Sequence, residues 1–483
     1  FDGRATTGRG PCSGPVRDGF TGNTRAPTIR RLSPAGGVYE PTRAEAFAKT
    51  AQALVPYLLV AGLIVLRNPA AVLRAEFWAE DGTEFFRTAL ARGASSLWTP
   101  VFGYQFFVSR AIAWAATFPP VVATPYLYAA ACLVLNAASV GYFARDGFTW
   151  LIPSRIQRVL VCGLLAVAPG SGEVFLSLCN LTNSLALLAL LMLLEKPHRL
   201  SWWKFAGLLL IGISSGHTVI LLPLILFLAY RTRERRYLYL ILALVPILLA
   251  NAIGNHHSGA ETGFLDYSKL WVAPRVVLKN FVARLVFAPF LGVHKTNAIL
   301  RKWGVRFWVS GAVALAGLLW TLRKTRYDRE AAEFLGLSYA LTVGTFGIII
   351  VSRAYVADVV QRNILWDIRY SFLPGVLADL IWLSLFLGWW RDRDVRRRLA
   401  MVGLAGIVLV SANNLRRWRH VPERPDVHWP ESAQSLQVVL DRRARGELSQ
   451  ATDVSGIRMH PVGTKFEWLT VTIPPSRPTA PSS

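Results

Sequence analysis

Charged residues are scarce in this chain of 483 residues. They make up 17% of it, whereas a soluble domain usually carries about 25%. This scarcity argues against a water-soluble globular protein. Cysteine is also rare: the four cysteines show no C-x-x-C or Cys/His spacing, which argues against a disulfide scaffold and a structural zinc site.

Apolar residues, by contrast, are abundant and come in blocks. They form 53% of the chain, and the mean hydropathy is +0.36. Many blocks approach the length that crosses a bilayer, and short basic loops separate them. The predicted fold class is therefore all-α, a polytopic transmembrane helical bundle of about 11 spans. The predicted spans are 51–66, 121–144, 156–170, 180–194, 203–214, 217–230, 237–254, 307–322, 331–352, 370–390 and 399–412.

The net charge of +24 indicates the orientation of these spans. Basic residues cluster in the N-terminal tail and in loops 231–236, 323–329 and 391–398. With a cytoplasmic N-terminus and an odd number of spans, all four clusters face the cytoplasm, as the positive-inside rule requires. Segment 276–293 is interpreted as re-entrant or interfacial, because a further span there would move the third cluster outside. Anionic membrane lipids account for the charge, and no nucleic acid partner is expected.

Three regions follow from this arrangement. The first is a disordered basic N-terminal tail rich in Gly and Pro, and the second is the transmembrane domain, which includes a long outside loop. The third is a small extracytoplasmic tail, amphipathic near 435–440 and strand-like at 468–473. Their bounds are 1–45 for the tail, 46–412 for the transmembrane domain with its loop 67–120, and 413–483 for the C-terminal segment.

The outside loop contains the most unusual stretch, 77–82, which reads Phe-Trp-Ala-Glu-Asp-Gly. Its adjacent acids, Glu80 and Asp81, stand among aromatic residues just beyond the first predicted span. A carboxylate near hydrocarbon is costly unless it is paired, hydrogen-bonded or bound to a cation. A local interpretation also fits: Asp81 caps a short helix, and Glu84 completes a capping box. That interpretation leaves Glu80 unexplained, so a functional site remains the second hypothesis.

Other polar residues gather at the predicted outer ends of the spans, as a membrane-embedded site requires. Each has a structural alternative: single arginines extend to headgroups, a lone histidine packs against a carbonyl, and asparagines cap helices. The candidates are Tyr104, Arg110, Glu173, Asn180, Asn183, His217, Arg369 and Tyr370.

An acidic pair in the first outside loop resembles the signature of the GT-C superfamily of glycosyltransferases. The motif at 77–82, then Gly103-Tyr104 and Arg110, Glu173-Val174-Phe175 with Asn180 to Asn183, and Arg369-Tyr370 are similar to a little-characterised bacterial group of that kind. The resemblance covers about 70–390. The large outside C-terminal domain of several such enzymes is absent, which leaves acceptor recognition open.

The resemblance implies an enzyme of the bacterial cytoplasmic membrane whose C-terminus is extracytoplasmic. It would move a sugar, with inversion, from a polyprenyl-phosphate donor to an envelope glycan or lipid acceptor. Asp81 would be the base or a metal ligand, with Glu80 supporting it, and the two would share any divalent cation such as Mg²⁺ or Mn²⁺. Arg110, Arg369 and His217 would contact the phosphate, and Tyr104, Glu173, Asn183 and Tyr370 the substrates.

Two other functions remain open from the sequence. A transporter or flippase of a lipid-linked sugar would use the same outer arginines, and internal repeats or charged residues near the midplane would favour it. A non-catalytic membrane protein of envelope assembly would use the acids only as helix caps and loop residues.

Overall fold

The structure is a computed structural model. It describes residues 43–101, 104–168, 175–215, 218–257, 278, 281–324, 336–337, 339–340, 372–390, 395–419, 427–459 and 468–476. The chain divides at Ala51 into two units, and the following description concerns residues 52–483. Among the sequence predictions, the N-terminal tail, Glu173, His217, Arg369, Tyr370 and nearly all of span 331–352 lie outside the described residues.

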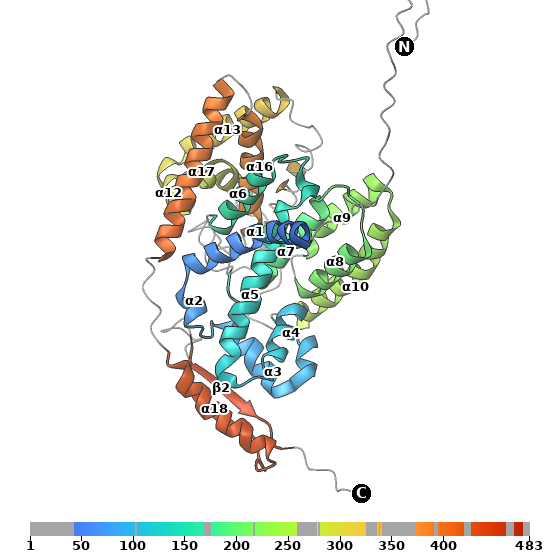
Figure 1. The fold of residues 1–483 in the computed structure, drawn as a ribbon, viewed down its shortest axis with the longest axis vertical. Coiled ribbons are helices and arrows are strands. Elements are labelled where there is room, and N and C mark those ends of the chain that lie inside the picture. The colour runs from blue at the N-terminus through green and yellow to red at the C-terminus, as the bar shows by residue number, and fades with distance from the viewer. Residues whose placement is uncertain are drawn as a thin grey trace, which may run out of the picture. The chain divides into compact units, whose positions relative to one another are not determined.

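Helices dominate the described chain (Figure 1), as predicted. The helices are α1 (Arg43–Arg67), α2 (Ala70–Leu73), η1 (Asp81–Phe86), α3 (Arg87–Arg92), η2 (Gly93–Trp98), α4 (Phe107–Ala115), η3 (Val121–Ala123), α5 (Thr124–Gly141), η4 (Tyr142–Ala144), η5 (Asp146–Phe148), α6 (Arg155–Ala166), α7 (Leu181–Leu194), α8 (Trp202–Ser214), α9 (Thr218–Thr232), α10 (Arg235–His257), η7 (Ala283–Phe287), α12 (Ala288–Trp303), α13 (Val305–Lys324), α16 (Phe372–Trp389), α17 (Val395–Arg419) and α18 (Trp429–Ala444). The strands are β1 (Thr452–Arg458) and β2 (Trp468–Ile473).

Apart from the segment 331–352, every predicted span coincides with one of these helices. Four helices in the described chain are long and apolar enough to cross a membrane: Arg43–Arg67, Val121–Ala144, Phe372–Trp389 and Val395–Arg416. Five further apolar helices, among them Leu181–Leu194 and Trp202–Ser214, are shorter. The total of about 11 spans therefore stays a prediction. In the segment predicted to be re-entrant, Gly292 interrupts α12 with a non-helical backbone (φ 73°, ψ 167°).

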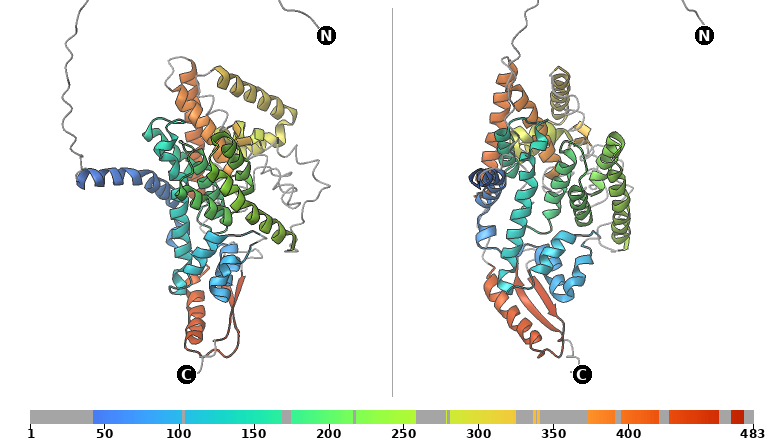
Figure 2. Two further views of the ribbon diagram at one scale, coloured as in Figure 1. Left: turned by 90° about the vertical axis from the view of Figure 1, so that its right-hand side faces the viewer. Right: turned by 45° about the vertical axis from the view of Figure 1, so that its right-hand side comes forward.

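The loop 67–120 lies at the end of the helix bundle where α5 and α7 begin and α8 and α10 end. Figures 1 and 2 show α3 and α4 beside the start of α5, with α8, α9 and α10 packed next to one another. Two hydrogen bonds connect the loop to the helix ends: Val108 N–H donates to Ser214 Oγ (3.1 Å), and Gln105 N–H donates to Asn251 Oδ1 (3.2 Å). The helix ends that the sequence assigned to one face are thus brought together.

The opposite end of the same helices is rich in basic residues. Glu195, just after α7, is 6% exposed and accepts hydrogen bonds from Tyr142 (2.6 Å) and Arg145 (2.9 Å), and Lys204 pairs with it at 2.7 Å. The same end collects Arg155, Arg158, Lys196, Arg199, Arg231, Arg233, Arg235 and Arg236. This segregation of charge agrees with the positive-inside pattern, although the orientation itself stays a prediction.

The C-terminal segment packs directly on the loop that carries the acidic pair. Trp429, 1% exposed, lies with its ring centroid 4.6 Å from that of Phe77 and 6.0 Å from that of Phe86. Its indole N–H donates to Val122 O (3.2 Å). Val427 N–H also donates to Glu76 Oε1 (3.1 Å). Because burying an aromatic ring stabilises such a contact by a few kcal/mol, α18 is firmly seated on this loop.

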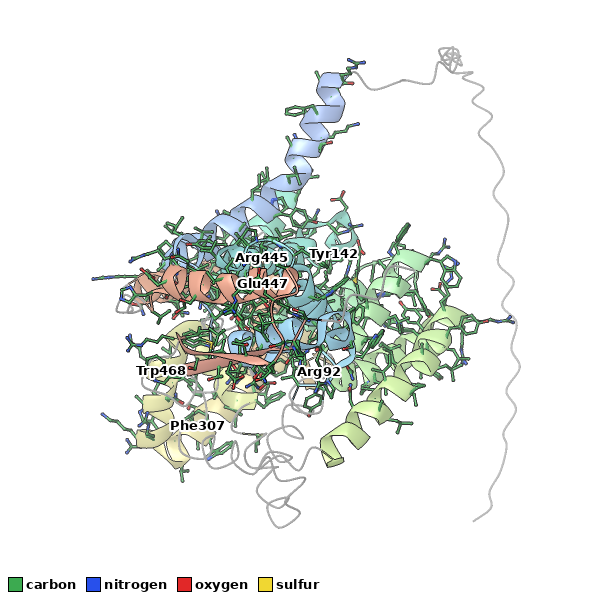
Figure 3. The ribbon with its side chains drawn as sticks, turned by 90° about the horizontal axis from the view of Figure 1, so that it is seen from below. Arg92, Tyr142, Phe307, Arg445, Glu447 and Trp468 are labelled. Carbon is green, nitrogen blue, oxygen red and sulfur yellow. The ribbon has the colours of Figure 1, made fainter. Side chains whose placement is uncertain are left out.

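The predicted secondary structure of this tail is confirmed. The amphipathic stretch near 435–440 lies in α18, and the strand-like stretch is β2, antiparallel to β1 with Thr452 opposite Ile473. Figure 3 shows Arg445 and Glu447 side by side just after α18, where they form an exposed ion pair. Alternate residues of β2, Leu469, Val471 and Ile473, are buried, which is the pattern of a strand with one packed face.

Gly82 of η1 lies against the C-terminal segment. A Cβ atom added at Gly82 would overlap the sulfur of Met459, which is fully buried at the end of β1. We expect Gly82→Ala to lower the free energy of unfolding by about 1–3 kcal/mol, the usual cost of overpacking. Met459→Ala removes the obstructing atoms, so Gly82→Ala should cost less in that background.

A double-mutant cycle measured by thermal unfolding in detergent tests this contact. Gly388→Ala, at an exposed glycine of α16 with no neighbour within 4 Å of an added Cβ and no left-handed backbone, is the control for the glycine substitution itself. Strict additivity of Gly82→Ala and Met459→Ala would contradict the packing of β1 on η1.

Candidate functional site

Asp81 begins η1, a π-helical turn that runs to Phe86, and its side chain points into the protein. The residue is 4% exposed. Its Oδ1 atom accepts hydrogen bonds from the Ser177 hydroxyl (3.2 Å) and from the Cys179 N–H (3.2 Å), both in the segment that leads into α7. The carboxyl group therefore connects the first loop to the start of α7, almost a hundred residues later in the chain.

The helix-cap interpretation of Asp81 is wrong. Glu80 occupies the position before η1, and no capping hydrogen bond from its side chain is found within the described residues. Asp81 is instead the first residue of the turn, and its carboxylate accepts hydrogen bonds from Ser177 and Cys179. The aromatic residues around the pair explain its burial, because Phe77, Phe85 and Phe86 are all at most 1% exposed.

The environment of Asp81 changes its proton affinity. Burial raises the pKa of the Asp81 carboxyl to about 7, and the neighbouring Glu80 charge adds to the rise. The hydrogen bonds from Cys179 and Ser177 act in the opposite direction, because they favour the ionised form. A carboxyl group that titrates near neutral pH can both accept and release a proton under physiological conditions.

Arg110 is not a headgroup-facing arginine, so the interpretation that it extends to the membrane surface is wrong. It is fully buried in α4, where its guanidinium donates to Glu84 O and to Thr99 O (3.2 Å) and lies 5.0 Å from the centre of the Phe85 ring. Burial lowers the pKa of Arg110 to about 10, so it stays charged at neutral pH. These bonds hold η1 and the end of η2 together, and a phosphate contact stays a prediction.

The two other described candidates lie near this core. Tyr104 is half-buried, and its main chain pairs with that of Val101 (N to O, 2.9 Å in both directions). Asn183, 5% exposed, lies in the first turn of α7 and donates from its amide to Asn180 O (3.2 Å). Asn180 occupies the cap position of α7, but its side chain makes no capping hydrogen bond to the described helix, so that interpretation is wrong.

Sequence reasoning missed three residues: Ser177 and Cys179, which contact Asp81, and Asp379, a buried acid of α16. Ser177 and Cys179 hold the Asp81 carboxyl, and no local sequence pattern marks them, because their role depends on a distant partner. Asp379 did have a signal: it is the sole charged residue in the apolar run 371–390. It is 6% exposed within α16, and an acid inside an apolar span is a functional candidate by itself.

The described residues contain no group of three or more His, Cys, Asp and Glu side chains that could hold a metal ion. Glu80 and Asp81 supply two carboxylates, one of which already accepts two hydrogen bonds from the protein. This donor set falls short of a protein-built site, because Mg²⁺ and Mn²⁺ bind through several oxygen ligands. Substrate phosphate oxygens would have to supply the remainder.

No protein-family model matches the chain. No curated protein matches it either. The chemistry of the residues around Asp81 is therefore the basis for a function.

Proposed function

We propose that this protein is an integral membrane glycosyltransferase of the GT-C kind. It would transfer a sugar from a polyprenyl-phosphate donor to an acceptor at the extracytoplasmic face of the bacterial cytoplasmic membrane. The observation that carries the proposal is the Asp81 carboxyl, which is buried beside a second acid at one end of the helix bundle, where burial raises its pKa to about 7. The membrane-spanning helices support the location, and the polar helix ends around the loop support a site there.

In this reaction Asp81 acts as the general base. The acceptor hydroxyl oxygen attacks the anomeric carbon and forms the new glycosidic bond, while its proton passes to the Asp81 carboxylate. The bond between the anomeric carbon and the phosphate oxygen breaks, and its electron pair leaves with the lipid phosphate. Attack from the opposite face inverts the anomeric carbon. Ser177 and Cys179 orient the base, since both hold its Oδ1 atom, and no step is assigned to a metal.

The test is a transfer assay in nanodiscs with polyprenyl-phosphate sugars that carry a radiolabel. We expect Asp81→Asn to lower label release by at least about 100-fold, the usual contribution of a positioned base. Asp453→Asn, the same change at an exposed carboxylate on β1, is the matched control and should leave turnover unchanged. If Asp81→Asn releases label at the wild-type rate, Asp81 is not the general base.

Transport of a lipid-linked sugar is the second candidate, and Asp379 is the observation that favours it. An acid buried within a membrane helix suits a proton- or ion-coupled transporter. If donor binds and no label is released with any acceptor, while Asp379→Asn abolishes donor movement across proteoliposomes, transport replaces transfer as the function.

A further inference from the structure

Three buried side chains on α5 and α7 carry polar atoms that lack a hydrogen-bond partner in the described part of the chain. These atoms are the Tyr128 hydroxyl, both amide atoms of Asn136 and the Ser184 hydroxyl. Tyr128 is 3% exposed, and Asn136 and Ser184 are fully buried. Since a buried polar group without a partner destabilises the fold, three such side chains in one helix pair indicate a ligand that satisfies them.

Two of these groups, Tyr128 and Asn136, lie along one face of α5, and Tyr128 is at the end nearer the loop that carries Asp81. Tyr128, Cys132 and Asn136 are four residues apart, so they share one face of α5, over about 12 Å of helix. The Tyr128 ring lies 5.5 Å from that of Phe77, which shares the loop with Asp81. Ser184 lies in the first turns of α7, the helix that packs along α5.

The chemistry of these atoms selects the ligand. The Asn136 amide offers two donors and an acceptor, and each hydroxyl offers both, so the ligand must donate and accept hydrogen bonds. A lipid chain does neither, and a cation would satisfy the oxygens but not the amide N–H groups. Water does both, and it is usual at buried polar sites that the protein leaves unsatisfied.

We propose that a file of ordered water molecules lies along this face of α5 and joins the Asp81 carboxyl to the Asn136 amide. The file hydrates a carboxyl group that the protein otherwise buries and lets it exchange its proton within the helix bundle. This assignment does not depend on the transferase function, because a transporter that used Asp81 would need the same exchange.

Radiolytic hydroxyl-radical footprinting of the full chain in nanodiscs tests the assignment. Radicals form from bound water in place, so a buried side chain is oxidised when water lies next to it. Two pairs of equally buried side chains distinguish oxidation by bound water from oxidation due to solvent exposure. In the first pair, Cys132 and its control Cys162 are both fully buried in apolar helices. In the second pair, Tyr128 and its control Tyr237 are both buried, but the Tyr237 hydroxyl already donates to His198 O (3.0 Å). We expect Cys132 and Tyr128 to be oxidised several-fold faster than Cys162 and Tyr237.

Equal oxidation within both pairs would overturn the proposal. Asn136→Leu replaces the amide by an apolar group of similar size and should lower Cys132 oxidation to the Cys162 level, with Tyr237 unchanged. Unaltered Cys132 oxidation in a folded Asn136→Leu variant would remove Asn136 from the file. If that variant does not fold, the wild-type comparison decides. Loss of sugar transfer in other experiments leaves all these outcomes unaffected, so the two proposals fail separately.

Discussion

Asp81→Asn should raise the melting temperature of the protein at pH 8 and raise it much less at pH 5. The physical reason is the pKa of the Asp81 carboxyl, which is about 7 in the folded protein and about 3.9 in an unfolded chain. Between these values the folded state keeps a proton that the unfolded state has lost. The free energy of unfolding therefore falls as the pH rises from about 4 to 7.

The expected size of this effect is large. A shift of about three pKa units corresponds to a destabilisation of about 4 kcal/mol at pH 8, fully developed above pH 7. Asparagine carries no charge and can still accept the Ser177 and Cys179 hydrogen bonds, so the variant avoids this cost. Calorimetry in detergent at pH 5 and pH 8, with Asp453→Asn as control, measures it. A variant less stable than wild type at pH 8 would show that Asp81 is ionised and stabilising in the folded protein.

The result would also distinguish a catalytic role of Asp81 from a structural role. A substitution that abolishes sugar transfer and stabilises the protein marks a residue retained at the expense of stability, as is common at active sites. A structural carboxylate would behave in the opposite way, because its loss would weaken the fold.

Arg110→Leu should lower the free energy of unfolding by about 3–6 kcal/mol, because each hydrogen bond of a charged group contributes roughly 1.5–3 kcal/mol and two are lost. The guanidinium bridges Glu84 O and Thr99 O, and both carbonyls, which belong to half-buried residues, would lose this partner. Arg110→Lys should recover part of this loss, since an ammonium group keeps the charge but does not have the two-pronged geometry of arginine.

Thermal unfolding and limited proteolysis of the loop 67–120 measure the effect of Arg110. Arg87→Leu makes the same change at an exposed arginine of the same loop and should shift stability by less than about 0.5 kcal/mol. If Arg110→Leu keeps wild-type stability and loses only donor affinity, Arg110 is a phosphate ligand, as the sequence suggested, and the structural role is wrong.

Much of the local structure was predictable. Long apolar runs predicted α1, α5 to α10, α13, α16 and α17, and the strand-like stretch predicted β2, whereas no predicted span covered α2, α3 or α4. The acidic pair at 80–81 was recognisable as unusual because carboxylates among aromatic residues conflict with the solvation of charge. The gathering of polar helix ends around the first loop followed from counting spans and basic loops.

The partners of these residues were not predictable. The bonds of Asp81 to Ser177 and Cys179 cross 96 and 98 residues, and the contact of Val427 with Glu76 crosses 351. The cap assigned to Asp81 was wrong because a local pattern cannot show that a distant segment competes for the same side chain. The buried position of Arg110 was hidden for the same reason.

The sequence by itself determined where the helices form and which side chains are costly to bury, because apolar periodicity and charge act over one or two turns of chain. The tertiary structure alone decided what each costly side chain binds. Packing of α5, α7 and the C-terminal segment around the first loop buries Asp81 within the protein and brings Ser177 and Cys179 to it. Burial and partners together set its pKa, and neither property is encoded within a single stretch of residues.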